Sequence, residues 1–318
     1  MPFSPEIIEK LELLEQKYKA MGQDLLSYLD GLLYAEYLTY WDYIHLDTLL
    51  SLQTPRTPFP DEKIFIVYHQ ITELYFNLCL HELEQLQGQE KVSANQLLNT
   101  AERIGRYFQN LVQSFEIMVD GMDPKQFLKY RMSLLPASGF QSAQYRMIEI
   151  HCTDFIRLVN KDHRDNLKNA NIEEQFEHIY WKQGATELAS GKQTLTLKQF
   201  DKKYKDNLVQ LAFNCRESNL FSLYRALEPE EQANETLKQA LRNVDVLINV
   251  NWPLSHYKSA VRYLQKDPED IKATGGTNWQ KYLPPRFQKR IFYPELWSES
   301  DIENWGKGWV NEVVFGKQ

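Results

Sequence analysis

The chain has 318 residues, of which 43% are hydrophobic, 13% aromatic and 25% charged. This composition can supply a sizeable core, so intrinsically disordered and fibrous classes are excluded. The formal net charge is −7, from 36 basic and 43 acidic side chains. Because the sequence holds no dense basic block, we expect no nucleic-acid partner.

The cysteines and the hydropathy of the sequence exclude further classes of protein. Cys79, Cys152 and Cys215 are far apart and form no Cys-x-x-Cys pair, so neither a disulfide framework nor a cysteine-rich zinc site is expected. The amino-terminal stretch is rich in glutamate rather than basic residues, which argues against a signal peptide. No apolar run reaches the roughly 18 residues of a spanning helix. We therefore expect a cytoplasmic protein with no membrane partner.

Apolar residues recur at intervals of three and four along most of the chain, which predicts helices rather than strands. Acidic or proline residues mark several of the expected helix starts, as at Asp61 and Pro229. The sequence predicts one all-α domain over residues 1–318. The helices expected are Pro5–Met21, Leu25–Leu52, Glu62–Gln87, Ala94–Val119, Phe140–Asn160, Leu197–Leu227 and Pro229–Lys266.

The carboxyl-terminal portion, from about Asp267, differs in composition from the rest. It contains four of the seven tryptophans together with Gly275, Gly276, Pro284, Pro285 and Pro294. Such a mixture suits a packed, hydrogen-bonded loop region better than a helix.

The common metal and phosphate motifs are missing from the sequence. No histidine follows a glutamate at the Glu-x-x-His spacing of di-iron bundles, and His-Glu-x-x-His is also absent. Gly275-Gly276 has no lysine at the spacing of a phosphate-binding loop. Di-iron, zinc-protease, nucleotide and nicotinamide sites are therefore not predicted.

Two histidines in apolar helical surroundings are the first candidate functional residues. His69 lies one helical turn after Phe65, in the run Ile64 to Gln70. His256 follows Trp252-Pro253, where the proline removes a backbone donor and bends the helix. Each histidine could be a core residue bonded to a neighbour. Alternatively, His69 could make one hydrogen bond inside an apolar pocket, and His256 could be the axial ligand of a macrocycle.

A third constellation surrounds Arg131. This arginine ends a short helical pattern after Phe127 and could bind a carboxylate with two hydrogen bonds, or it could be an ordinary capping arginine. The following Ser138-Gly139 step resembles a helix start, whose backbone donors favour packing or contact with an anion.

Several separated motifs, in the same order, make the chain resemble the tryptophan 2,3-dioxygenase family. The resemblance spans roughly Leu38 to Trp297. Its motifs are Tyr40-Trp41-Asp42-Tyr43-Ile44-His45-Leu46-Asp47, Phe65-Ile66-Val67-Tyr68-His69-Gln70 with Glu73-Leu74, Phe127 to Arg131, Pro136-Ala137-Ser138-Gly139-Phe140-Gln141-Ser142, Trp252 to His256, Thr274-Gly275-Gly276-Thr277, and Phe292-Tyr293-Pro294-Glu295-Leu296-Trp297.

The resemblance implies a b-type haem, enclosed by long helices and ferrous in the active form. It implies that His256 is the proximal ligand of the iron, with Trp252, Ser138 and Gly139 among the cofactor-binding residues. It also implies that His69 is the distal histidine, which meets the indole N–H of the substrate, and that Phe65 lines the same pocket.

The remaining site residues carried over from the family bind the rest of the substrate. The resemblance implies that Arg131 pairs with the amino acid carboxylate, that Thr274 contacts the ammonium and carboxylate end, and that Phe127 lies beside them. Tyr40, Tyr43 and Ile44 match a segment that reaches over the indole pocket from a neighbouring subunit. A homotetramer, a dimer of dimers, is implied, with residues 1–37 as a helical extension in the oligomer contacts.

The implied reaction inserts both atoms of O2 across the indole C2–C3 bond of L-tryptophan. The product would be N-formyl-L-kynurenine, the first compound of the kynurenine route of tryptophan degradation. The sequence departs from the common pattern at Phe127, where many members carry Tyr, at Ala273 in place of Gly, and in a longer spacing from His256 to Thr274. A haem mono-oxygenase acting on a substituted tryptophan, and a non-catalytic haem or tryptophan sensor, are the alternatives.

Overall fold

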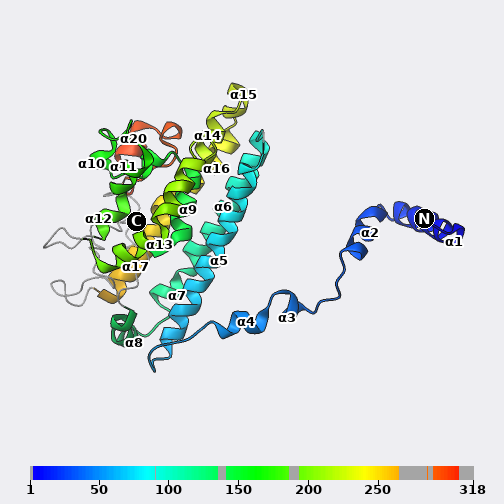
Figure 1. Ribbon diagram of the computed structural model, residues 1–318, viewed down its shortest axis with the longest axis horizontal. Helices are drawn as coiled ribbons and strands as arrows, with labels where there is room; N and C mark the ends of the chain where they lie inside the picture. The colour runs from blue at the N-terminus through cyan, green and yellow to red at the C-terminus, as the bar shows by residue number, and fades with distance from the viewer. Residues whose placement is uncertain are drawn as a thin grey trace. The chain divides into compact units, whose positions relative to one another are not determined.

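The computed structural model describes residues 3–89, 91–134, 141–185, 193–264, 285 and 289–307 (Figure 1). The chain separates into two compact units, residues 1–54 and 55–318. The prediction that the whole chain is a single domain stays a prediction.

The amino-terminal unit consists of short, solvent-exposed helices. They are α1 (Pro5–Ala20), α2 (Leu25–Leu33), α3 (Tyr40–Tyr43) and α4 (Leu46–Ser51). Helix α1 confirms the first predicted helix, but the continuous helix predicted over Leu25–Leu52 is wrong. Tyr37 and His45 adopt left-handed backbone conformations, with φ of 56° and 51°, and such residues interrupt a right-handed helix.

None of residues 3–54 is buried. Large apolar side chains of this unit are nevertheless solvent-exposed, Tyr37 by 92% and Leu33 by 75%. The others above half exposed are Phe3, Leu13, Met21, Leu26, Leu32, Tyr34, Leu38, Tyr40, Trp41, Tyr43, Leu50 and Leu52. So much uncovered apolar surface is unusual for a segment that remains in water alone.

The second unit is all-α within the described residues, as predicted. Its longer helices are α5 (Asp61–Gln87), α6 (Ala94–Ser114), α9 (Ala143–Cys152), α13 (Leu195–Asn214), α16 (Glu235–Val246) and α17 (Trp252–Leu264). Its shorter helices are α7 (Glu116–Val119), α8 (Pro124–Tyr130), α10 (Lys161–Arg164), α11 (Ile172–Glu177), α12 (Tyr180–Gly184), α14 (Leu220–Arg225), α15 (Pro229–Gln232) and α20 (Glu299–Glu303). The turns η1 (Arg131–Leu134), η3 (Phe155–Leu158) and η5 (Pro294–Leu296) are 3₁₀-helical, and η4 (Leu247–Asn251) is π-helical.

Several predicted helices are divided in the structure. The pattern from Ala94 to Val119 becomes α6 and α7, and the pattern from Leu197 to Leu227 becomes α13 and α14. Helix α14 starts anew at Asn219, whose side chain accepts the backbone N–H of Ser222. A cap of this kind marks the start of a new helix where the apolar pattern itself continues without a break. Among the described residues, the only strand-like pairing is one isolated bridge between Val159 and Ile179.

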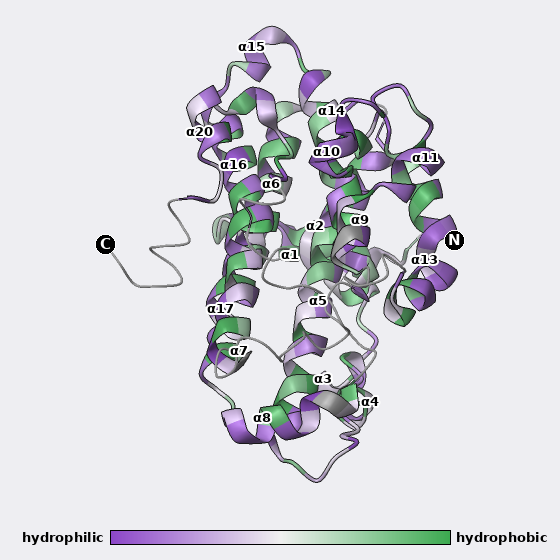
Figure 2. Cartoon of the chain, turned by 90° about the vertical axis from the view of Figure 1, so that its left-hand side faces the viewer, coloured by the Kyte–Doolittle hydropathy of each residue, from purple (hydrophilic) through white to green (hydrophobic). Residues whose placement is uncertain are grey.

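Helices α5, α6, α9 and α16 pack side by side and form the body of this unit (Figure 1). The close approach of α6 to α16 depends on Gly105, because a Cβ there would lie 3.1 Å from Nδ2 of Asn243. Apolar residues on the facing sides, including Leu97, Ile104, Phe108 and Leu241, are fully buried. Figure 2 shows both apolar and polar residues along α16 and α17, as expected for helices with one buried side.

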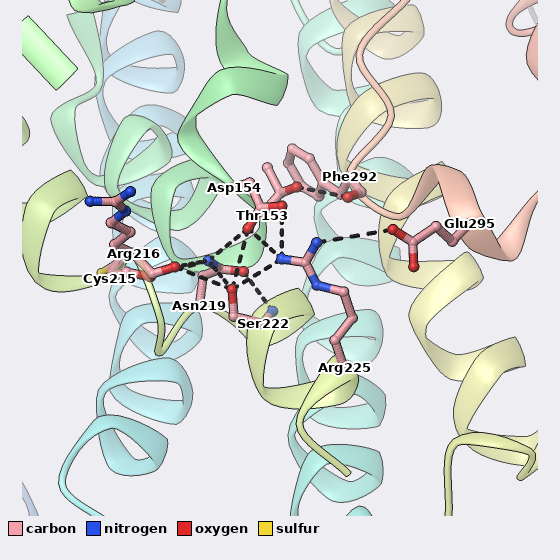
Figure 3. Close-up of polar contacts among 9 residues, drawn as sticks. All are labelled: Thr153, Asp154, Cys215, Arg216, Asn219, Ser222, Arg225, Phe292 and Glu295. Atoms are coloured by element: carbon pink, nitrogen blue, oxygen red, sulfur yellow. Dashed lines mark hydrogen bonds and ion pairs between the residues drawn. The ribbon is translucent and has the colours of Figure 1, made fainter. Parts of the chain in front are cut away.

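The carboxyl-terminal segment is held against the bundle by buried hydrogen bonds. Asp245 of α16 accepts the backbone N–H groups of Phe292 and Tyr293 at 3.0 and 3.2 Å, and Nε1 of Trp297 at 3.0 Å. Thr153 adds a bond from its hydroxyl to the carbonyl of Phe292 (Figure 3). The described part of this region is therefore a hydrogen-bonded segment with one short helix, as its composition indicated.

A second anchor in the same region is an ion pair. Arg225 of α14 donates to both carboxylate oxygens of Asp154, at 2.7 and 2.8 Å (Figure 3). It also lies 4.0 Å from Glu295. This contact fixes the turn before η3 to α14, away from the candidate site described below. None of the helices in the described residues combines the length and the apolarity needed to cross a membrane.

Candidate functional site

His69 lies on the long helix α5 and is oriented by its own helix. Its Nδ1 is 2.7 Å from the carbonyl oxygen of Phe65, one turn earlier. A carbonyl only accepts hydrogen bonds, so Nδ1 carries the proton and the lone pair of the neutral ring is on Nε2. The ring of Phe65 stacks beside the imidazole, with centroids 4.1 Å apart.

The imidazole of His69 is accessible to solvent and at the same time partly desolvated by the protein around it. Solvent reaches its side chain, yet desolvation by the surrounding protein lowers its pKa, and the charge of Glu73 opposes that shift only in part. A ring that is both desolvated and reachable can receive a small ligand while remaining neutral.

His256 lies on α17 and repeats the same arrangement. Its Nδ1 is 3.0 Å from the carbonyl oxygen of Trp252, so Nδ1 again carries the proton and Nε2 the lone pair. The imidazole is flanked by Trp252 at 4.5 Å and Phe115 at 4.4 Å between ring centroids. Burial lowers its pKa to about 4, so the ring is neutral at physiological pH.

The rings of His69 and His256 are connected through two other aromatic rings. The ring centroid of Tyr68 lies 6.4 Å from that of His69 and 5.7 Å from that of Phe115, which lies 4.4 Å from that of His256. His69 and Arg146 are also among the groups that lower the pKa of His256, after its burial. Two neutral imidazoles, each with Nδ1 fixed by a backbone carbonyl, are thus brought together from α5 and α17.

Phe127 and Arg131 come from α8 and the turn that follows it. Phe127 lies between Phe65 and Tyr263, with ring centroids at 6.5 and 4.7 Å. Arg131, the C-cap of α8, is buried, with 5% of its surface exposed, and burial lowers the pKa of its guanidinium. A buried arginine next to an aromatic wall is suited to binding a carboxylate.

Helix α8 is fixed to the start of α5 by reciprocal hydrogen bonds. The backbone N–H of Asp123 donates to Asp61 at 2.6 Å, and the backbone N–H of Asp61 donates to Gln126 at 3.3 Å. Asp123 also caps α8 through the N–H groups of Lys125 and Gln126. These contacts place Phe127 beside Phe65, and therefore near His69.

The predicted site residues are only partly brought together by the described structure. Phe65, His69 and Phe127 form one set of ring contacts, Trp252 and His256 form another, and the rings of Tyr68 and Phe115 lie between the two sets. Thr274, Ser138 and Gly139 lie outside the described residues. Tyr40, Tyr43 and Ile44 belong to the amino-terminal unit, in and just after α3.

Two residues of this region were not predicted from the sequence. Phe115 stacks on His256, and Tyr145 of α9 donates to the carbonyl of Ile248 just before α17. Phe115 follows the end of α6, about 140 residues from His256, so no local spacing connects them. The described residues contain no cluster of three or more histidine, cysteine or acidic side chains able to hold a metal ion.

Comparison with known proteins assigns the chain to a family. The family model described as tryptophan 2,3-dioxygenase matches residues 32–196. A tryptophan 2,3-dioxygenase of Herpetosiphon aurantiacus is 30% identical over 269 residues, covering 82% of this chain and 96% of that protein. One from Ruegeria is 26% identical over 286 residues, covering 83% of this chain and 92% of that protein.

A shorter and stronger match agrees with these two. A tryptophan 2,3-dioxygenase of Anaeromyxobacter is 42% identical over 113 residues, or 35% of this chain and 42% of that protein. The family match includes Phe65, His69, Phe127 and Arg131. With nearly the whole length of a relative aligned at 30% identity, the chain belongs to the tryptophan 2,3-dioxygenase family of dioxygenase enzymes.

Proposed function

We propose that this chain is a haem-dependent dioxygenase that opens the indole ring of L-tryptophan. The product is N-formyl-L-kynurenine, as in the first step of tryptophan degradation through kynurenine, and we propose the cytoplasm as its location. The observation that carries the proposal is the pair His69 and His256, two neutral imidazoles whose Nδ1 atoms are held by backbone carbonyls so that Nε2 carries the lone pair. A buried arginine, Arg131, ends the short helix that carries Phe127.

The donor set fits a b-type haem. A haem would bring most of its iron ligands with it, so the protein would need to supply one nitrogen rather than a cluster of ligands. Nε2 of His256 suits this role because Nδ1–H is held by the carbonyl of Trp252, which fixes the tautomer. The aromatic rings of Phe115 and Trp252 leave little room for the imidazole to rotate. We propose His256 as the axial ligand.

Bound ferrous haem supplies the activation of O2, and the residues of the chain position the substrate. His69 accepts the indole N–H at Nε2, because its Nδ1 proton is committed to Phe65. No strong general base is needed for this chemistry, so a neutral histidine with a depressed pKa is sufficient. The hydrogen bond instead fixes the angle at which indole C2 and C3 are presented.

Arg131 holds the other end of the substrate. A guanidinium can make two parallel hydrogen bonds to the amino acid carboxylate, and these bonds are strong where water is excluded. Thr274 contacts the ammonium and carboxylate end in this proposal. Phe65 and Phe127 form the apolar wall that keeps water away from the indole.

We further propose that the active enzyme is a homotetramer in which neighbouring subunits complete each site. The support is the amino-terminal unit, whose helices bury none of their own residues and expose many large apolar side chains. Another copy of the chain would remove this surface from water. Tyr40, Tyr43 and Ile44 lie in this unit and would reach the substrate of a neighbour.

The proposal is tested by the fate of labelled oxygen. Reduced, haem-loaded protein is mixed with L-tryptophan under ¹⁸O₂, and the product is analysed by mass spectrometry. Two labelled atoms in a ring-opened product support dioxygenation. One labelled atom would reassign the chain to mono-oxygenation and direct attention to Phe127, which has no hydroxyl to offer the substrate. Haem binding without turnover of any indole would favour the sensor alternative.

A further inference from the structure

The helix that bears His256 starts from an irregular turn. In η4 the backbone widens, so that the N–H of Trp252 bonds to the carbonyl of Leu247, five residues earlier. If the same spacing continued, the N–H of residue 253 would bond to the carbonyl of Ile248. Residue 253 is proline, which has no N–H. The carbonyl of Ile248 therefore loses its donor within the helix.

A side chain from another helix replaces the missing donor. The hydroxyl of Tyr145, on α9, lies 3.0 Å from the carbonyl oxygen of Ile248. Both residues are buried, Tyr145 to 7% and Ile248 to 0% exposure. Without the hydroxyl, this carbonyl would be a buried acceptor with no partner, a costly state in a protein interior.

The hydroxyl is also oriented to donate. Burial raises the pKa of Tyr145 to about 12, so it keeps its proton at physiological pH. The carbonyl oxygen of Ile248 can only accept, so the tyrosine hydroxyl is the donor of the bond between them.

The bond lies directly upstream of the axial histidine. Trp252 closes the widened turn with its N–H, and its carbonyl, in turn, receives Nδ1 of His256. The ring of Tyr145 packs on Phe76 at 5.4 Å, and Phe76 packs on Trp252 at 5.8 Å. A shift of the turn would therefore move Trp252 and rotate the imidazole of His256.

We propose that Tyr145 is a positioning residue for His256: its hydroxyl replaces the donor removed by Pro253, holds the widened turn closed, and so fixes the direction of the axial imidazole. This inference deepens the proposed function and rests on His256 as the haem ligand. Widened turns of this kind often occur at functional sites, where they redirect a side chain.

A double-mutant cycle tests the link between the two residues. Tyr145→Phe removes only the hydroxyl and keeps the ring. Pro253→Ala supplies a backbone N–H that can bond to Ile248 in its place. We expect Tyr145→Phe to reduce the folding equilibrium constant of the apoprotein about tenfold, as for an orphaned buried acceptor, and much less in the Pro253→Ala background.

The position of His256 is measured separately. The imidazole resonances of His256 are followed by NMR in the apoprotein, and the iron–histidine vibration by resonance Raman in the reduced holoprotein. Tyr145→Phe should shift the NMR resonances, broaden the iron–histidine band and weaken haem binding. Adding Pro253→Ala to this variant should restore much of all three properties. Tyr224→Phe is the matched control, because Tyr224 is also buried and donates to a backbone carbonyl, that of Gln232 at 2.9 Å.

The outcomes separate this inference from the proposed function. Equal effects of Tyr145→Phe in both backgrounds, or His256 signals that do not change, would overturn the positioning role. If Tyr224→Phe changed the His256 signals as much as Tyr145→Phe does, the positioning role would also be overturned, because the effect would then reflect a general loosening of the fold. If the unmodified chain binds no haem, the proposed function fails, while the NMR and stability measurements on the apoprotein still decide whether Tyr145 positions His256.

Discussion

His256 donates its Nδ1 proton to the carbonyl oxygen of Trp252, four residues earlier, at a distance of 3.0 Å. His69 makes the equivalent bond to Phe65 over 2.7 Å. In both cases the residue four positions earlier is aromatic and packs against the imidazole. The same local device thus fixes two neutral rings with Nε2 as the available nitrogen, although one is proposed to bind iron and the other substrate.

Removal of the proposed axial ligand should abolish stable haem binding. His256→Gly deletes the only imidazole proposed to bind the iron, so the Soret absorbance of reconstituted protein should fall at least tenfold. Added imidazole should restore part of it, because a free ring can enter the space left behind. His163→Gly, at an exposed histidine on α10, is the control and should bind haem normally. A full Soret band in His256→Gly would assign the ligand elsewhere.

Substitution of Arg131 should act on substrate binding. Arg131→Leu removes the charged hydrogen bonds to the carboxylate, and we expect KM for L-tryptophan to rise by the equivalent of about 2 to 4 kcal/mol. Arg131→Lys should recover only part of this, since an ammonium cannot bind the carboxylate in the same forked geometry. Arg262→Leu, which breaks a surface ion pair with Asp120, is the control. An unchanged KM in Arg131→Leu would contradict the carboxylate role.

The extent to which this molecule could be predicted from its sequence depends on the range of the interactions. Local periodicity predicted α1 and α5 almost to the residue, because a helical spacing of apolar residues and the proline or acidic residues in the first turn define such helices. Periodicity failed over Leu25–Leu52, where Tyr37 and His45 adopt left-handed backbone conformations. Residues other than glycine adopt this conformation infrequently, so the sequence does not indicate the two interruptions.

In the candidate site, too, local relationships could be predicted from the sequence and tertiary contacts could not. Phe65 and His69, or Trp252 and His256, are one turn apart and could be paired from spacing alone. The packing of Phe115 against His256 and the bond from Tyr145 to Ile248 depend on tertiary packing between residues about 140 and 103 positions apart. Periodicity carries no information on such contacts, and only the family resemblance had placed His69 and His256 in one site.

Acid should destabilise the apoprotein through His151. This histidine is 97% buried within α9, next to Cys215, and burial lowers its pKa to about 4 from 6.5. The unfolded chain therefore binds a proton between these pH values that the folded chain does not, so stability is full above pH 6.5 and falls as the pH drops towards 4. The loss should reach about 3 kcal/mol at pH 4.

Urea unfolding between pH 7 and 4 measures this effect. His151→Gln should flatten the dependence of the unfolding free energy on pH, whereas His163→Gln, at the surface, should leave it unchanged. Asp245, with a pKa raised to about 6, acts in the opposite direction, since its folded form binds the extra proton between about pH 4 and 6. Asp245→Asn should therefore steepen the acid limb, and an unaltered slope in both variants would refute the assignment.

Subunit completion of the site predicts complementation between two inactive variants. A chain with Tyr40→Ala and Tyr43→Ala lacks the residues proposed to reach a neighbour, and a chain with Arg131→Leu lacks the carboxylate-binding residue. Each should be nearly inactive alone. After co-refolding, mixed tetramers contain sites that combine the intact parts of both chains, and we expect roughly a quarter of the wild-type activity. Activity no greater than the sum of the separate variants would mean that each subunit uses its own tyrosines.

Neutralisation of Glu149 should be the most damaging single change in the second unit. Its carboxylate, fully buried on α9, forms ion pairs with both Arg146 and Arg290. Glu149→Gln keeps the shape but leaves two buried guanidinium groups without this countercharge, and we expect the unfolding free energy to fall by about 3 to 5 kcal/mol.

The matched control for this change is a carboxylate that also pairs with two cations but is half exposed. Glu177 contacts Lys182 and Lys205, with 46% of its side chain exposed, so Glu177→Gln should cost about 1 kcal/mol or less. Because Arg146 is one of the charges that lower the pKa of His256, Glu149→Gln should also lower that pKa further. A loss of stability equal to that of Glu177→Gln would mean that other groups or water, rather than Glu149, neutralise the two arginines.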